Sequence, residues 1–165
     1  PRSAPVSERA ATRTCDARAA AAALDALELR AGAAVLITGA ASGIGSAAVA
    51  LAVRNGLEVF VVAGAHDHDL LAALGATRFV SSAGDPAATL RGICPSGVDA
   101  VLDAAGMRCA ILPAVRSGGR IADLHGWRPR LERGIRAVSG RITPSEGRPA
   151  GTPLARDSRP APDAT

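Results

Sequence analysis

The residues of this chain that are best suited to bind a ligand lie in one glycine-rich run, Thr38-Gly39-Ala40-Ala41-Ser42-Gly43-Ile44-Gly45. The apolar residues 35–37 before the run predict a buried strand, and the alanine-rich residues 46–52 after it predict the start of a helix. A glycine turn between a strand and a helix presents free backbone N–H groups to the oxygens of a diphosphate. The spacing therefore predicts a nucleotide-binding turn.

Each glycine of the run has its own expected role. Gly39 makes the turn, Gly43 or Ser42 lets the backbone approach the diphosphate, and Gly45 lets the helix lie close to the strand. The Ser42 hydroxyl is a further candidate donor. The alternative is a turn that only packs a helix on a strand; the strand before the run and the helix after it favour ligand binding.

The end of the next predicted strand bears on which dinucleotide binds. A carboxylate that binds the 2′-hydroxyl of the adenosine ribose is expected about 20 residues beyond the glycines. Residues Ala63-Gly64-Ala65 stand there without an acid, so we expect NADPH rather than NADH. No arginine stands there either, and His66 and His68 are candidate partners for the 2′-phosphate or else plain surface residues.

The elements that position these residues alternate along the chain between strands and helices. The expected strands cover residues 35–38, 58–63, 78–81, 98–103, 119–124 and 134–142, and the expected helices cover residues 15–30, 46–55, 66–74, 86–94 and 107–115. Strict alternation of this kind is typical of a parallel sheet. We predict an α/β fold, a Rossmann-type doubly wound parallel sheet of about six strands with helices on both faces.

The chain of 165 residues has room for one such domain. Residues 1–14 show no hydrophobic periodicity, and we expect them to be poorly ordered. Residues 143–165 are rich in proline and arginine, and we expect a disordered tail. The dinucleotide-binding domain then covers residues 15–142.

The composition excludes several classes of function. Every basic residue except histidine is an arginine, and tyrosine is absent, so a mechanism that needs a catalytic lysine or tyrosine is excluded within this chain. The net charge of +4 is spread along the chain and aromatic residues make up only 2%, so we expect no specific nucleic-acid binding.

The cysteines and the apolar segments give no sign of a metal or a membrane. Cys15, Cys94 and Cys109 are too far apart for metal-ligand spacing, and we expect reduced thiols in a cytoplasmic protein and no metal site. No segment reaches the roughly 20 apolar residues that a membrane-spanning helix needs.

Six segments, in their order and spacing, resemble the cofactor domain of the medium-chain dehydrogenase/reductase family, in particular its zinc-independent quinone oxidoreductase branch. The resemblance covers roughly residues 20–140. The segments are Leu29-Arg30-Ala31-Gly32, Val35-Leu36-Ile37-Thr38-Gly39, Gly45-Ser46-Ala47-Ala48-Val49, Leu70-Leu71-Ala72-Ala73-Leu74-Gly75-Ala76, Val98-Asp99-Ala100-Val101-Leu102-Asp103-Ala104-Ala105-Gly106 and Gly118-Gly119-Arg120-Ile121.

The resemblance implies where a nicotinamide dinucleotide binds. The nicotinamide would lie over the carboxyl ends of the fourth and fifth strands. His125 is the candidate proton donor there, and Asp103 is either a cap for the following turn or a ligand contact. The expected cofactor-binding residues are Gly39, Ala41, Ser42, Gly43, Ile44, Gly45, Gly64, Ala65, Ala105, Gly106, Leu124 and His125.

The glycine run alone also matches the TGxxxGIG signature of the short-chain dehydrogenase/reductase family. That family protonates its carbonyl substrate with a Tyr-x-x-x-Lys pair, and this chain contains neither residue type. Ala104-Ala105-Gly106 also lacks the asparagine of the corresponding short-chain segment. The short-chain reading is therefore the less favoured alternative.

Two classes of function stay open. In the first, the chain is the NADPH-binding half of a quinone or enone reductase that transfers hydride to a small carbonyl or quinone substrate. Members of the resembled family carry an N-terminal barrel-like catalytic domain that has no counterpart here, so its partner domain is expected on another segment or polypeptide, and an oligomer is possible. In the second, the chain is a stand-alone or degenerate nucleotide-binding module without turnover.

Overall fold

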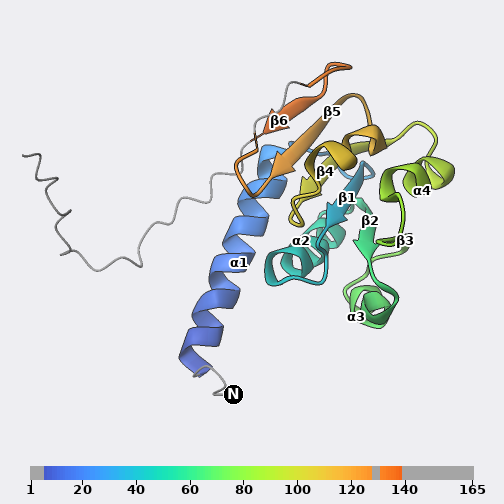
Figure 1. Ribbon diagram of the computed structural model, residues 1–165. Helices are drawn as coiled ribbons and strands as arrows, with labels where there is room; N and C mark the ends of the chain where they lie inside the picture. Colours follow the sequence, from blue (N-terminus) through green and yellow to red (C-terminus); the bar gives the residue numbers. More distant parts are fainter. Residues whose placement is uncertain (1–5, 128–130, 139–165) are drawn as a thin grey trace, which may run out of the picture.

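The computed structural model describes residues 6–127 and 131–138, with side chains from residue 11 onward. Its centre is a six-stranded, wholly parallel sheet with the strand order β3-β2-β1-β4-β5-β6 (Figure 1). The strands are β1 Ala34–Thr38, β2 Glu58–Ala63, β3 Arg78–Ser81, β4 Val98–Asp103, β5 Val115–Asp123 and β6 Arg136–Val138. This confirms the predicted fold class.

The register of the sheet brings three strand ends into one row. Thr38 at the end of β1 pairs with Asp103 at the end of β4, and Asp103 pairs with Asp123 at the end of β5. β1 and β4 meet where the strand order reverses, which is the point at which sheets of this kind bind ligands. The sheet therefore places three polar side chains at its ligand-binding edge.

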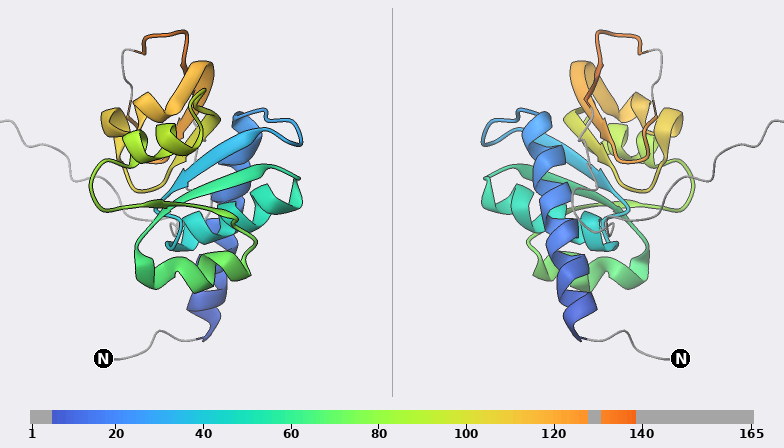
Figure 2. Two further views of the ribbon diagram at one scale, coloured as in Figure 1. Left: turned by 90° about the vertical axis from the view of Figure 1, so that its right-hand side faces the viewer. Right: turned by 90° about the vertical axis from the view of Figure 1, so that its left-hand side faces the viewer.

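Helices cover both faces of the sheet (Figures 1 and 2). One face packs against α1, α2 and α3, and the other packs against α4 and two 3-10 turns, η2 and η3. The bounds are α1 Val6–Ala26, α2 Gly43–Arg54, α3 His68–Ala73 and α4 Pro86–Ile93, with 3-10 turns η1 Ala65–Asp67, η2 Arg108–Ala110 and η3 Leu112–Ala114.

The strand β1 shows why both faces must be covered. Val35 and Ile37 belong to the core under α1 and α2, whereas Leu36 belongs to the core under α4, and all three are fully buried. A strand that is apolar on both faces is the signature of a central parallel strand. Small side chains such as Ala20 and Ala48 let α1 and α2 approach the sheet closely.

Helix caps fall where the sequence places polar residues before apolar runs. The Ser42 hydroxyl accepts a hydrogen bond from the N–H of Gly45 at 3.0 Å and caps α2. Asp85 accepts from the N–H of Ala88 at 3.0 Å and caps α4, whose first residue is Pro86.

Two expected helices differ from the structure. The first, expected over residues 15–30, runs instead from Val6 to Ala26, so it begins inside the segment 1–14 for which poor order was expected. The second, expected over residues 107–115, is replaced by η2 and η3, because Arg108 takes a left-handed φ of 54° and Pro113 lacks a backbone donor. β5 accordingly begins at Val115.

The ends of the predicted domain are only partly described. The strand expected over residues 134–142 is present as β6, Arg136–Val138, while residues 139–142 and the predicted tail 143–165 lie outside the described residues. No helix in the described part of the chain is long and apolar enough to cross a membrane.

Candidate nucleotide-binding site

A pocket of about 350 Å³ opens at the carboxyl ends of β1, β2 and β4. Five of the residues expected to bind the cofactor line it: Gly39, Ala41, Ser42, Gly64 and Ala105. The remaining lining residues are Ala40, Val62, Ala63, Asp67, Ser82 and Met107. The glycine turn predicted from the sequence therefore lies at this pocket.

Two glycines are required by the shape of the turn. Gly39 has a φ of 61°, and a Cβ there would lie 3.0 Å from the backbone nitrogen of Ala105. A Cβ on Gly45 would lie 2.1 Å from the carbonyl oxygen of Gly39. Gly39 thus lets the loops after β1 and β4 meet. Gly45 lets α2 start directly against the turn, which is the close approach that the sequence predicted for it.

The first turn of α2 supplies donors suited to an anion. Because the N–H of Gly45 is taken by the Ser42 hydroxyl, the N–H groups of Gly43 and Ile44 are those left without a partner within the helix. They lie at the positive end of the helix dipole, next to the pocket. A diphosphate placed against this turn would receive hydrogen bonds from the backbone alone.

One carboxylate lies close to the same turn. A Cβ on Gly43 would lie 2.2 Å from Oδ2 of Asp16, so this side chain of α1 rests against the first residue of α2. The helix dipole stabilises a carboxylate at this place. A bound diphosphate would share the first turn of α2 with this negative charge.

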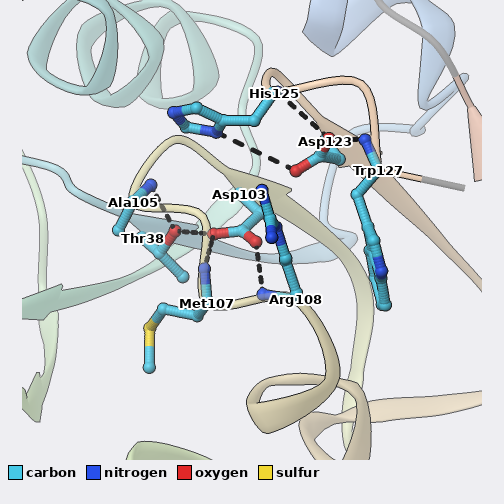
Figure 3. A network of polar contacts seen from close by, with 8 residues as sticks. All are labelled: Thr38, Asp103, Ala105, Met107, Arg108, Asp123, His125 and Trp127. Atoms are coloured by element: carbon cyan, nitrogen blue, oxygen red, sulfur yellow. Dashed lines mark hydrogen bonds and ion pairs between the residues drawn. The ribbon is translucent and has the colours of Figure 1, made fainter. Parts of the chain in front are cut away.

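The loop after β4 is held by Asp103, which is fully buried (Figure 3). Its Oδ1 accepts hydrogen bonds from the Thr38 hydroxyl at 2.5 Å and from the N–H of Met107 at 3.0 Å, and its Oδ2 accepts from the N–H of Arg108 at 2.7 Å. The Thr38 hydroxyl also accepts from the N–H of Ala105 at 3.1 Å. Of the two roles left open for Asp103, the structure shows the cap.

The loop after β5 is built in a similar way around Asp123 (Figure 3). Its Oδ2 accepts hydrogen bonds from the N–H groups of His125, at 3.0 Å, and of Trp127. The imidazole of His125 is 47% exposed and its Nδ1 lies 3.9 Å from Oδ1 of Asp123. A Cβ on Gly106 would lie 3.6 Å from the same Nδ1, so the imidazole lies beside the loop after β4.

The other expected residues are not among those that line the pocket. Gly43, Ile44 and Gly45 form the first turn of α2. Ala65 begins η1, directly after the lining residue Gly64. The expected nicotinamide end, Gly106, Leu124 and His125, lies together at the ends of β4 and β5, where the N–H of Leu124 donates to the carbonyl oxygen of Asp103 at 3.3 Å.

Among the pocket-lining residues, Asp67 bears most on which dinucleotide the pocket binds. It lies at the end of η1 and lines the pocket beyond β2, where the sequence analysis expected no carboxylate. Its distance from Gly45 in the sequence falls within the approximate spacing of a ribose-binding acid, so Asp67 is a further candidate for that role. Met107 and Ser82 carried no comparable signal.

The two histidines considered as partners for a 2′-phosphate make different contacts. His66 is exposed, with its Nε2 3.2 Å from Oδ2 of Asp67. The ring of His68 stacks on Phe79 with a centroid distance of 3.8 Å. Of the two, His66 is the histidine whose imidazole pairs with the carboxylate of a pocket-lining residue.

A second hollow, of about 300 Å³, lies at the opposite, amino-terminal end of the strands. Its guanidinium groups are partly neutralised, because Arg116 pairs with Asp99 and Arg120 pairs with Glu28. It contains neither the glycine turn nor a helix start. It is not the nucleotide site that the fold predicts.

No cluster in the described residues offers three histidine, cysteine, aspartate or glutamate side chains to a metal ion. Cys15, Cys94 and Cys109 are free thiols. The pocket, by contrast, fits a dinucleotide in three respects: a turn that only glycine can form, unpaired backbone donors at a helix start, and the location at the switch point of the sheet.

Fold and site together define a dinucleotide-binding α/β domain. Residues 43–124 match the family model described as zinc-binding dehydrogenase. The chain belongs to the medium-chain dehydrogenase/reductase family, as a cofactor-binding domain. This sets the short-chain alternative aside.

Comparisons with individual proteins agree with this family. Erythronolide synthase EryA2 of Saccharopolyspora erythraea is 57% identical over 51 residues, which is 31% of this chain and 1% of that protein. The crystal structure of CurK enoyl reductase superposes with a TM-score of 0.65 at 26% identity, covering 75% of this chain and 41% of that one. The crystal structure of AibC gives a TM-score of 0.70 at 28% identity, covering 79% and 44%. The chain thus spans less than half the length of these relatives.

Proposed function

We propose that the chain is the nicotinamide-dinucleotide-binding domain of a reductase that adds hydride to a carbon–carbon double bond conjugated with a carbonyl group. The observation that carries the proposal is the pocket at the switch point of the sheet, with the first turn of α2 on one side and His125 near the other. The similarity to CurK enoyl reductase supports the enone class among the substrates expected from the sequence.

The residues of the chain bind and orient the cofactor in this proposal. The N–H groups of Gly43 and Ile44 hold the diphosphate, and the close contact of Gly39 with Ala105 shapes the floor of the pocket. The nicotinamide ring lies toward Gly106 and His125. When bound, the cofactor supplies the hydride, and the protein supplies orientation and exclusion of water.

The expectation of NADPH now has an opposing feature. It rested on the absence of a carboxylate after β2, but Asp67 lines the pocket there. A carboxylate accepts hydrogen bonds from ribose hydroxyls and repels a 2′-phosphate. His66 beside Asp67 is the group that favours NADPH, because its protonated ring would offset the negative charge. The choice between the two cofactors in this proposal therefore depends on His66 and Asp67.

The substrate-binding part of the active site is expected on a partner domain. Within the chain there is no lysine or tyrosine to protonate a substrate, and the described pocket is lined mainly by small side chains. In the proposal, this domain holds the dinucleotide while another segment or polypeptide closes over the nicotinamide and binds the unsaturated substrate.

The proposal is tested in two stages with the full chain. Calorimetric titration with NADPH and NADH measures binding. Oxidation of the better-bound cofactor is then followed, after addition of a separately produced barrel domain of an enoyl reductase, with a short enoyl thioester and, separately, with a quinone. Saturable binding with faster oxidation by the enoyl thioester supports the proposal. Faster oxidation by the quinone overturns the substrate class, and absence of binding overturns the whole proposal.

The second candidate function is a nucleotide-binding module without turnover. The observation that favours it is that, within the described residues, His125 is the candidate proton donor near the pocket. Binding of a dinucleotide with no oxidation by either substrate, even after addition of a separately produced barrel domain of an enoyl reductase, would favour this candidate.

A further inference from the structure

Asp123, at the carboxyl end of β5, holds a buried oxygen that lacks a partner. Its side chain is 5% exposed. Among the buried side-chain atoms of the described residues, Oδ1 of Asp123 is the one without a hydrogen bond. An unpaired buried carboxylate oxygen is destabilising, so its presence at a ligand-binding edge suggests a partner that it meets in the working state.

The imidazole of His125 is a donor close to this oxygen. The backbone N–H groups of His125 and Trp127 hold Oδ2, which fixes the plane of the carboxylate and directs Oδ1 toward the imidazole. Nδ1 lies 3.9 Å from Oδ1, about 1 Å beyond hydrogen-bond distance. Hydrogen bonds at catalytic sites are often this long before ligands bind, and they shorten in the complex.

The other ring nitrogen of His125 points away from Asp123 (Figure 3). The imidazole lies beside Gly106, which carries no side chain that would cover it and which directly follows the pocket-lining residue Ala105 in the chain. Nε2 is thereby open to a molecule at the nicotinamide end of the pocket.

The neighbouring carboxylate of Asp103 does not compete for this histidine. Both of its oxygens are occupied, by the Thr38 hydroxyl and by the N–H groups of Met107 and Arg108. Asp123 is therefore the acidic group that faces His125 from the described elements around it.

We propose that Asp123 is a positioning residue that holds His125 as the proton donor of the reduction. This rests on the proposed function. After hydride has added to the β-carbon of the substrate, the α-carbon needs a proton. The Nε2–H bond of the imidazolium breaks, its electron pair stays on Nε2, and a C–H bond forms at the α-carbon. Asp123 accepts the Nδ1–H throughout and stabilises the positive ring, and solvent then reprotonates Nε2.

The test is the tautomer of His125, measured in the full chain by nitrogen-detected NMR of histidine side chains at a pH where the ring is neutral. Assignment comes from H125Q. A carboxylate acceptor beside Nδ1 fixes the Nδ1–H tautomer, with Nε2 unprotonated. In D123N the amide can donate to Nδ1, so we expect the two nitrogens to exchange their chemical-shift classes. The amide oxygen of the new asparagine can still accept from the backbone N–H groups of His125 and Trp127. A backbone amide spectrum like that of the wild type shows that D123N is folded.

The matched control is D67N, which changes the carboxylate beside a different histidine, His66. It should leave the His125 nitrogens unchanged. If His125 has the Nε2–H tautomer in the wild-type chain, or if D123N leaves the tautomer as it was, Asp123 does not position this ring and the inference is wrong.

A second measurement separates this inference from the proposed function. Addition of oxidised cofactor should move the His125 ring resonances and leave those of His68, which stacks on Phe79, in place. If no amide of the glycine turn responds to cofactor, the proposed function fails while the tautomer result stands. If the turn responds and the His125 ring does not, the histidine is not at the nicotinamide and the inference fails alone.

Discussion

The hydroxyl of Thr38 donates to Oδ1 of Asp103 at 2.5 Å, which joins the last residues of two adjacent strands that lie 65 positions apart in the chain. The same hydroxyl accepts the N–H of Ala105. Both groups are fully buried. The pair sets the distance between the glycine turn after β1 and the loop after β4, and so the width of the proposed dinucleotide pocket.

Thr38→Val removes this hydroxyl and leaves a buried carboxylate oxygen and a backbone N–H short of a partner. We expect the free energy of unfolding to fall by about 1–3 kcal/mol, measured by urea denaturation. Thr38→Ser keeps the hydroxyl and should lose less stability than Thr38→Val. Equal losses for the two variants would show that the hydroxyl contributes nothing beyond packing.

Gly45→Ala tests the close approach of α2 to the glycine turn. The added methyl group would lie 2.1 Å from the Gly39 carbonyl oxygen, so the turn must shift. We expect a loss of stability of about 1–3 kcal/mol and loss of dinucleotide binding by calorimetry. The control is Gly92→Ala in α4, where no atom lies within 4 Å of the new Cβ. Binding retained in Gly45→Ala would contradict the role of this turn.

Asp67→Asn tests which cofactor the pocket selects. Removal of the charge should raise the affinity for NADPH relative to NADH by on the order of tenfold, because the repulsion of the 2′-phosphate disappears. The measurement is a pair of titrations for each variant. Asp69→Asn, a change to an exposed carboxylate of α3 that does not line the pocket, should leave the ratio unchanged. A ratio unaffected by Asp67→Asn would place the ribose elsewhere.

Asp16→Asn tests the carboxylate that rests against Gly43. Its negative charge lies beside the expected diphosphate position, so its removal should tighten the binding of NADPH and NADH alike, by about twofold to tenfold at low salt. The gain should shrink as salt screens the charge. Asp25→Asn, at an exposed position near the C-terminal end of α1, serves as the control. Weaker binding in Asp16→Asn would mean that this carboxylate supports the turn instead.

Much of this fold was predictable because the signals were local. The alternation of apolar strands with helices gave the sheet, and Ser42 and Asp85 marked two helix starts. The prediction of a helix over residues 107–115 was wrong. Its apolar spacing carries no information about the left-handed conformation of Arg108 or the missing backbone donor of Pro113. Local backbone conformation of this kind has no hydrophobic period.

The site was predictable where a residue acts through its backbone. Gly39 and Ser42, which were named from the glycine run, line the candidate pocket because the turn itself fixes their place. Asp67 and Asp123 were missed because their importance depends on where a loop returns after a strand ends. The direction of such a loop is fixed by tertiary contacts, for example the stacking of His68 on Phe79 just beyond Asp67.

The central claim is that this domain binds a nicotinamide dinucleotide at the glycine turn, and titration followed by the fluorescence of Trp127 tests it most directly. Trp127 is the single tryptophan of the chain, and its backbone N–H donates a hydrogen bond to Asp123 at the proposed nicotinamide end. The account predicts a saturable change in emission with NADPH or NADH in the wild-type chain and none in Gly45→Ala. No change with either cofactor at millimolar concentration, confirmed by calorimetry, would contradict it.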